Sequence, residues 1–559
     1  MTHRRVALAV ILALSAGLFP AAAGGGLSSI RPEELREWLT DVSSDEMLGR
    51  AIYGAGLGLT AAYIEEHLRQ WDVRAAGDAG GYLQTVRVRG VRTTSRSSVT
   101  VQVGRQSRTF KDGEGVTFQK FQGSSRSVVA PRVEFVGYGI DAPAAGQMDY
   151  RGKDVKDAAV VFLGANGPKT VDSGTYRQIL TGRSRYAVDQ QGAIASIDAA
   201  LSSGDTGGRG GGQNASGRAG SANVPVDFTT SRRLDQPIAP DVSASDEFLT
   251  FLFSRAPVGY DELKRKAAAL EPLPSFRLND VSIRFDVEAD YEIARTQLTH
   301  NVVALVEGSD PQLRSSYVAL GAHYDHIGYA ERSAAPGSER PPGAPGRVTA
   351  GAGADHIWNG ADDNGSGTVT LMALARAFRE GPPPKRSIVF VWHTGEEAGL
   401  YGSRYFTDYP TVPIEAIVAQ LNVDMVGRNR NDDQEQANTV YLVGSDRISS
   451  ELHEISRAAN SSLPHPLTLD YEMNDPSDPE QLYYRSDHYS YAAKGIPVIF
   501  FTTGLHPDYH ANTDEVSKIQ FDKLTRVAGL IFETASRVAN LDHAPVRDRR
   551  GARAGKGTP

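Results

Sequence analysis

Short apolar runs alternate with amphipathic segments between residues 300 and 540. The runs are rich in Val, Ile and Phe, which is typical of strands buried on both faces of a sheet. These predicted strands lie at 301–308, 316–326, 387–395, 416–426, 439–445 and 496–504. Between them, apolar residues recur at helical spacing at 367–380, 399–409, 448–460, 487–495 and 521–541. The alternation predicts an α/β fold with a mostly parallel mixed sheet flanked by helices.

The segment before residue 96 has the pattern of two helices followed by a strand. Leu35, Trp38 and Leu39 recur at helical spacing, and so do Ile64 and Leu68 further on. We therefore expect residues 24–95 to be an N-terminal helical part of the α/β domain.

A different texture begins at about residue 96. Short alternating runs bounded by Gly, Asp and Pro replace the helical periodicity, and they indicate β-rich structure. We interpret 96–235 as an inserted β-rich domain and 236–542 as the main α/β domain. The basic, weakly apolar stretch 543–559 is typical of a disordered tail, and the Pro/Gly-rich stretch 330–352 is typical of a long loop.

The first 23 residues resemble a secretory signal peptide. Basic residues precede a short apolar stretch, and Ala21, Ala22 and Ala23 offer a small-residue cleavage site. The apolar stretch is short for a membrane span, although an uncleaved anchor is the alternative reading. We expect a secreted or periplasmic protein that is not stably associated with a membrane after cleavage.

Composition narrows the function classes. The 559-residue chain has a net charge of −8, which argues against a nucleic-acid partner because such a partner requires a basic face. It contains no cysteine, so neither disulfides nor thiolate metal ligands are available.

Imidazole and carboxylate side chains occur where the predicted strands end. Such side chains, without thiolates, are the ligands of hydrolytic metal sites, and zinc binds both kinds. Because ligands collect at the carboxyl ends of strands in open α/β sheets, these residues are expected at one rim. The pattern predicts a co-catalytic metal centre. Its candidate residues are His323, Asp325, His326, Asp362, Asp363, Asn364, Glu396, Glu397, Asp424 and His510.

These motifs, "GAHYDHIG", "NGADDNGSGT", "HTGEEAG", "LNVDMVG" and "DYHANTDE", resemble those of the secreted di-zinc aminopeptidases. The wider family includes glutamate carboxypeptidase, transferrin receptor and glutaminyl cyclase. The resemblance covers 300–540, which makes 236–542 the expected catalytic zinc peptidase domain. The stretch 133–164 resembles the protease-associated domain that is often inserted into these enzymes.

The resemblance implies two zinc ions per chain. His323 and Asp424 would bind one ion, Glu397 and His510 the other, and Asp363 would bridge both. The family often has a cis peptide bond after this aspartate, which here would join Asp363 to Asn364.

The resemblance also implies roles beyond ligation. Glu396 would be the general base, and Asp325 would accept the free ring N–H of His323. Asp487 is a candidate for the same duty toward the other half of the site. Tyr509 would donate to the developing oxyanion, or would instead be a rim residue that packs. For His506 a surface position is expected.

The leading functional hypothesis is a secreted metallo-exopeptidase that hydrolyses N-terminal residues from peptides or proteins. A carboxypeptidase of the same fold is one alternative, because Arg428, Arg430 or Arg485 could bind a terminal carboxylate. A glutaminyl cyclase is disfavoured, since that lineage uses one zinc. A catalytically silent, receptor-like binding module is disfavoured because Glu396 and every ligand are present.

Overall fold

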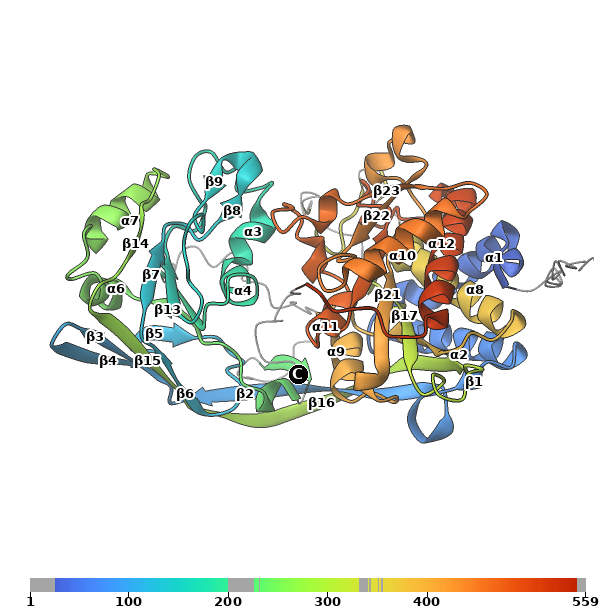
Figure 1. Cartoon of the computed structure of the whole chain (residues 1–559), viewed down its shortest axis with the longest axis horizontal. Helices are drawn as coiled ribbons and strands as arrows, with labels where there is room; N and C mark the ends of the chain where they lie inside the picture. Colours follow the sequence, from blue (N-terminus) through green and yellow to red (C-terminus); the bar gives the residue numbers. More distant parts are fainter. Residues whose placement is uncertain are drawn as a thin grey trace, which may run out of the picture.

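The computed structural model describes residues 26–199, 226–230, 232–330, 340, 343–349, 351–352 and 355–549. They form two lobes that a pair of long strands joins, as the lower part of Figure 1 shows. The lobe that carries the C-terminal residues contains the predicted metal-site motifs.

The first lobe is built on a ten-stranded mixed sheet. Its centre, β20–β17–β21–β24, is parallel, and antiparallel pairs flank this centre. The predicted α/β class is therefore confirmed, with parallel pairing concentrated where the motif-bearing strands lie. The strand order is β12 (Asp227–Thr230), β2 (Leu83–Ser95), β16 (Ala289–Val306), β20 (Ser387–His393), β17 (Tyr317–His323), β21 (Ile417–Val423), β24 (Val498–Thr502), β22 (Thr439–Val443) and β23 (Thr468–Asp470), with β1 (Arg74–Ala75) on β16.

Helices cover both faces of this sheet. Alternate residues of one strand pack in different apolar clusters: Val318 and Leu320 of β17 lie in one and Ala319 in another. Burial on both faces explains why these strands are continuously apolar in sequence. One face is covered by α1 (Pro32–Val42), α2 (Ala55–Gln70), α8 (Gly367–Glu380), α10 (Ser450–Ser461) and α12 (Phe521–Asn540), and the other by α9 (Tyr401–Asp408) and α11 (His488–Ala492).

The second lobe has a ten-stranded sheet of its own, with short helices. The order is β14 (Ser275–Arg277), β7 (Val133–Val136), β10 (Ala159–Phe162), β11 (Ala195–Ala199), β13 (Asp241–Ala244), β5 (Gly115–Phe118), β4 (Gln106–Asp112), β3 (Ser98–Val103), β15 (Val281–Val287) and β6 (Arg126–Ala130). Smaller elements are α3 (Arg177–Thr181), α4 (Arg183–Asp189), α6 (Asp246–Leu252), α7 (Tyr260–Ala268) and the pair β8 (Asp141–Ala142) and β9 (Gln147–Met148). In the first lobe, they are α5 (Arg232–Asp235) and the pair β18 (Gly328–Tyr329) and β19 (Ile357–Trp358).

The second lobe corrects the domain boundary that we expected at residue 235. Strand β15 pairs with β3 and β6, so this lobe continues to Val287. Helix–strand alternation in 240–290 looks like that of the main domain in sequence, and only the long-range pairing assigns it to the other sheet. The identification of a protease-associated domain stays a prediction.

Two further expectations concerned the ends of the chain. The predicted signal peptide, residues 1–23, lies outside the described residues. At the other end, residues 543–549 are not the free tail that was expected, because Asp548 accepts from the Ser450 backbone N–H at 2.8 Å. Within the described part of the chain, no helix has both the length and the apolar character to cross a membrane.

Candidate metal centre

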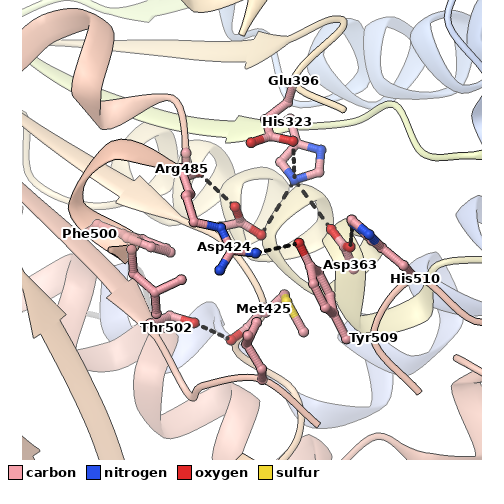
Figure 2. A pocket seen from close by; sticks show the side chains of 13 residues that line it. His323, Asp363, Glu396, Asp424, Met425, Arg485, Phe500, Thr502, Tyr509 and His510 are labelled. Carbon is pink, nitrogen blue, oxygen red and sulfur yellow. Dashed lines mark hydrogen bonds and ion pairs between the residues drawn. The ribbon is translucent and has the colours of Figure 1, made fainter. Parts of the chain in front are cut away.

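The predicted ligands converge at the carboxyl ends of the parallel strands. His323 is the last residue of β17, and Asp424 directly follows β21. Glu397 follows β20, His510 lies in the loop after β24, and Asp363 precedes α8. Residues far apart in sequence thereby come together, and all of these except Glu397 line one pocket, which Figure 2 shows from close by.

A first group contains His323, Asp363 and Asp424. The His323 Nε2 atom lies 3.4 Å from Asp363 Oδ1 and 3.4 Å from Asp424 Oδ1. The second oxygen of Asp424 accepts a hydrogen bond from Ser486 Oγ at 2.7 Å, which fixes the orientation of the carboxylate.

A second group shares Asp363. The His510 Nε2 atom lies 3.4 Å from Asp363 Oδ2 and 3.1 Å from Glu397 Oε2. Asp363 thus turns one oxygen to each group, and Figure 2 shows it between His323 and His510. His326 joins this group, with Nδ1 at 2.9 Å from Glu397 Oε1. The Asp363–Asn364 peptide bond is cis, as the resemblance implied.

These two groups fit a pair of metal ions. Two ligand atoms on a tetrahedral zinc, each about 2.0–2.1 Å from the ion, lie about 3.3–3.4 Å apart. This matches the His323–Asp363, His323–Asp424 and His510–Asp363 separations, whereas His510 and Glu397 lie closer, at 3.1 Å. Asp363 Oδ2 and Asp424 Oδ1 are buried and have no hydrogen-bond partner among the described residues. Unpaired buried carboxylate oxygens are costly, and a cation would satisfy them.

Glu396 and Glu397 are neighbours with opposite electrostatic settings. Burial raises the pKa of Glu396 well above its ordinary value, although the His323 ring favours its charged form. Burial acts on Glu397 too, but His510 and His326 outweigh it and hold the pKa of Glu397 well below its ordinary value. The pKa values of the two neighbouring glutamates are therefore shifted in opposite directions.

Asp325 contacts its predicted partner through a different atom. The Nδ1 atom of His323 lies 3.1 Å from the backbone oxygen of Asp325 and 3.8 Å from its carboxylate. The carboxylate instead accepts the backbone N–H of Glu396 at 3.1 Å. Asp325 thus connects the strand end that carries His323 with the start of the segment that carries Glu396.

Tyr509 projects its hydroxyl into the pocket (Figure 2). Its ring stacks on His510 with centroids 3.8 Å apart, and its hydroxyl accepts from Arg485 Nη2 at 3.2 Å. Burial raises the pKa of the hydroxyl well above its ordinary value, so Tyr509 is a proton donor rather than a phenolate. The rest of the pocket includes the apolar side chains Met425, Leu482, Phe500 and Leu505.

Three sequence expectations around the pocket come out differently. His506 is buried, not exposed, and its Nε2 lies 3.3 Å from Asp362 Oδ2. Asp487 lies 3.4 Å from the ring of His393 rather than beside a predicted ligand. Each of the three arginines considered for carboxylate binding forms an ion pair: Arg428 with Asp508, Arg430 with Glu472 and Arg485 with Glu480. Of the three, Arg485 lines the pocket.

Sequence reasoning missed two buried residues that position the site. Asp514 accepts the backbone N–H groups of Asp362 and Asp363, both at 3.0 Å. Arg50 donates to the backbone oxygens of Tyr324 at 3.1 Å and Gly360 at 2.8 Å. Both act through backbone atoms of distant segments. The one signal was that Asp514 lies four residues after His510.

Comparison with known proteins finds similarity to peptidases. Residues 301–535 match the sequence model of Peptidase family M28. Leucine aminopeptidase 1 of Trichophyton equinum is 27% identical over 250 residues, which cover 43% of this chain and 58% of the relative. The corresponding protein of Trichophyton rubrum is 28% identical over the same length. The chain thus spans less than two thirds of these relatives.

Solved structures of similar proteins include an aminopeptidase from Aneurinibacillus sp. strain AM-1, with 19% identity, a TM-score of 0.43 and coverage of 93% of this chain and 97% of that one. A zinc aminopeptidase from Bacillus subtilis has 16% identity and a TM-score of 0.42, with coverage of 93% and 98%. The part of the chain from residue 301 to residue 535 is thus similar to peptidase family M28.

Proposed function

We propose that this protein is a secreted metallo-exopeptidase that removes N-terminal residues from peptides, with two zinc ions per chain and Glu396 as the general base. The observation that carries the proposal is Asp363, which offers one carboxylate oxygen to each of two His/carboxylate groups. The match of residues 301–535 to family M28 and the leucine aminopeptidases among the relatives support the same activity. Export rests on residues 1–23 alone.

Five residues would hold the metals: His323 and Asp424 on one side, Glu397 and His510 on the other, and Asp363 between them. Two zinc ions bound there would polarise the scissile carbonyl and lower the pKa of the attacking water.

Glu396 and Tyr509 would have different roles in proton transfer and hydrogen bonding. Glu396 lies at the pocket, with Oε2 at 4.0 Å from His323 Nε2, and would take the proton of the water and return it to the leaving amine. Because Arg485 donates to the oxygen of Tyr509, the proton of that hydroxyl stays available for the developing oxyanion. The apolar lining favours an apolar N-terminal side chain.

The test uses two matched peptides with an N-terminal leucine, one with a free and one with an acetylated amine. We expect cleavage of the free peptide alone, loss of activity on chelation and recovery when zinc is restored. Cleavage of both peptides from the carboxyl end would instead identify a carboxypeptidase, for which Arg485 is the candidate anchor. No cleavage of either would favour a binding module.

A further inference from the structure

One short segment forms a wall of the pocket and touches the catalytic machinery at two points. We call residues 482–489 the wall segment; Leu482, Arg485 and Ser486 line the pocket. Ser486 donates to Asp424 at 2.7 Å, and Arg485 donates to the Tyr509 hydroxyl at 3.2 Å. The position of this segment therefore determines how a predicted ligand and the predicted oxyanion donor are oriented.

The wall segment is held from outside by α4 of the second lobe. At the end of that helix, Gln190 Nε2 donates to the Tyr484 hydroxyl at 2.7 Å, and the Arg185 guanidinium lies 3.9 Å above the Tyr484 ring. At the other end of the wall segment, the Tyr489 hydroxyl donates to Asp189 Oδ2 at 2.7 Å. These two tyrosines flank Arg485 and Ser486 in sequence. Residues of α4 and its C-terminal end therefore contact the wall segment on both sides of these two pocket-lining residues.

The wall segment has little regular structure of its own. It consists of a three-residue 3₁₀ turn, Leu482–Tyr484, and the first residues of the five-residue helix α11. Helices this short are not stable in isolation and need tertiary contacts. Within the segment, the rings of Tyr484 and Tyr489 lie 5.1 Å apart, so support of one is transmitted to the other.

We propose that Arg185, Asp189 and Gln190 of the second lobe are positioning residues of the active site. They fix the wall segment, and through Arg485 and Ser486 they fix Tyr509 and Asp424. The role in catalysis rests on the proposed peptidase function, whereas the docking itself does not. The second lobe accordingly supports the pocket, although none of its described residues lines it.

The experiment replaces the three contacts together, as Arg185→Ala, Asp189→Ala and Gln190→Ala in the full chain. With zinc in the buffer, we expect wild-type metal content and an unchanged Tm, but a fall of about tenfold in kcat/KM because a small displacement of reacting groups is costly. The matched control is Arg177→Ala, which removes an exposed arginine from α3 of the same lobe. It should leave kcat/KM within about twofold of wild type.

A double-mutant comparison separates positioning from general destabilisation. If α4 acts through Arg485, adding the triple change to Arg485→Met should lower kcat/KM by no more than about twofold beyond Arg485→Met alone. Full multiplication of the two effects would overturn the proposal. An unchanged kcat/KM in the triple variant would overturn it as well.

Hydrogen exchange gives a readout that does not need activity. In the triple variant, amides of the wall segment should exchange at least about tenfold faster while those of β17 and β21 stay protected. Faster exchange in a chain that hydrolyses no peptide would uphold the docking and reject the peptidase function. Unchanged exchange would reject the docking whatever the activity.

Discussion

At the scale of single residues, the adjacent Glu396 and Glu397 have pKa values shifted in opposite directions because their side chains face different neighbours. Glu397 faces His510 and His326, and their effect on its pKa outweighs that of burial. Glu396 turns to the side of His323, where burial dominates. One carboxylate is thus suited to bind a cation and the other to exchange protons, although their side chains are identical.

Exchanging Glu396 for Gln tests this division of labour. Glu396→Gln should retain about two metal ions per chain, because it removes no predicted ligand, while kcat falls by about 10²–10⁴-fold through loss of the proton acceptor. Metal analysis and steady-state kinetics measure both quantities. Asp363→Asn is the matched control and should lose bound metal. A Glu396→Gln enzyme with most of its activity would contradict the role.

At the scale of elements, an ion pair fastens α1 to α8. Arg376 Nη1 donates to Glu34 Oε1 at 2.8 Å, and this hydrogen bond is the main reason that the pKa of Glu34 falls to about 2. The folded state therefore favours the carboxylate more strongly than the unfolded chain does. The resulting stability is fully present above pH 4.5 and is lost as the pH falls toward 2.

Glu34→Gln should accordingly lower the free energy of unfolding by about 1–3 kcal/mol at pH 7. The difference from wild type should shrink between pH 5 and pH 3, as thermal unfolding at several pH values would show. Glu33→Gln changes an exposed neighbour on the same turn and should have little effect. A difference that stays constant down to pH 3 would exclude the ion pair as its cause.

The elements of the first lobe were largely predictable, and some positions of the site were not. Burial on both faces makes β17 and β21 mostly apolar, and a predicted ligand lies at or directly after the end of each, so pattern and motif agree. Arg50 and His506 are polar residues in irregular segments, which sequence alone places at the surface. Their burial depends on partners such as Gly360 and Asp362 that only the folded chain brings near. The extent of the second sheet likewise depends on long-range pairing.

At the scale of the whole molecule, Arg50 ties the N-terminal segment to the rim of the metal centre. Its side chain is fully buried, and burial lowers its pKa to about 10. Besides Tyr324 and Gly360, it donates to the backbone oxygens of Val42 at 2.8 Å and Asn359 at 2.6 Å. The guanidinium group of Arg50 therefore connects segments that are about 300 positions apart in sequence.

Arg50→Met should leave these buried carbonyl groups without a donor and lower the free energy of unfolding by at least about 3 kcal/mol. It should also weaken metal binding, because Gly360 precedes the Asp363 turn. Denaturant unfolding and zinc titration measure the two effects. Arg69→Met, an exposed arginine on α2, is the control. Equal loss of stability in both variants would contradict the stabilising role assigned to the hydrogen bonds of Arg50.

The paired strands β2 and β16 make the second lobe a detachable insertion. Ser95 and Ala289 are direct antiparallel partners, and the chain between them forms the second lobe together with β12, which is an edge strand of the first sheet. A two-residue hairpin loop could close that gap, so a shortened chain that joins them should fold and keep its metals. Calorimetry and metal analysis would show this. Its wall segment would lack α4, and its weakened catalysis would match that of the α4 triple variant.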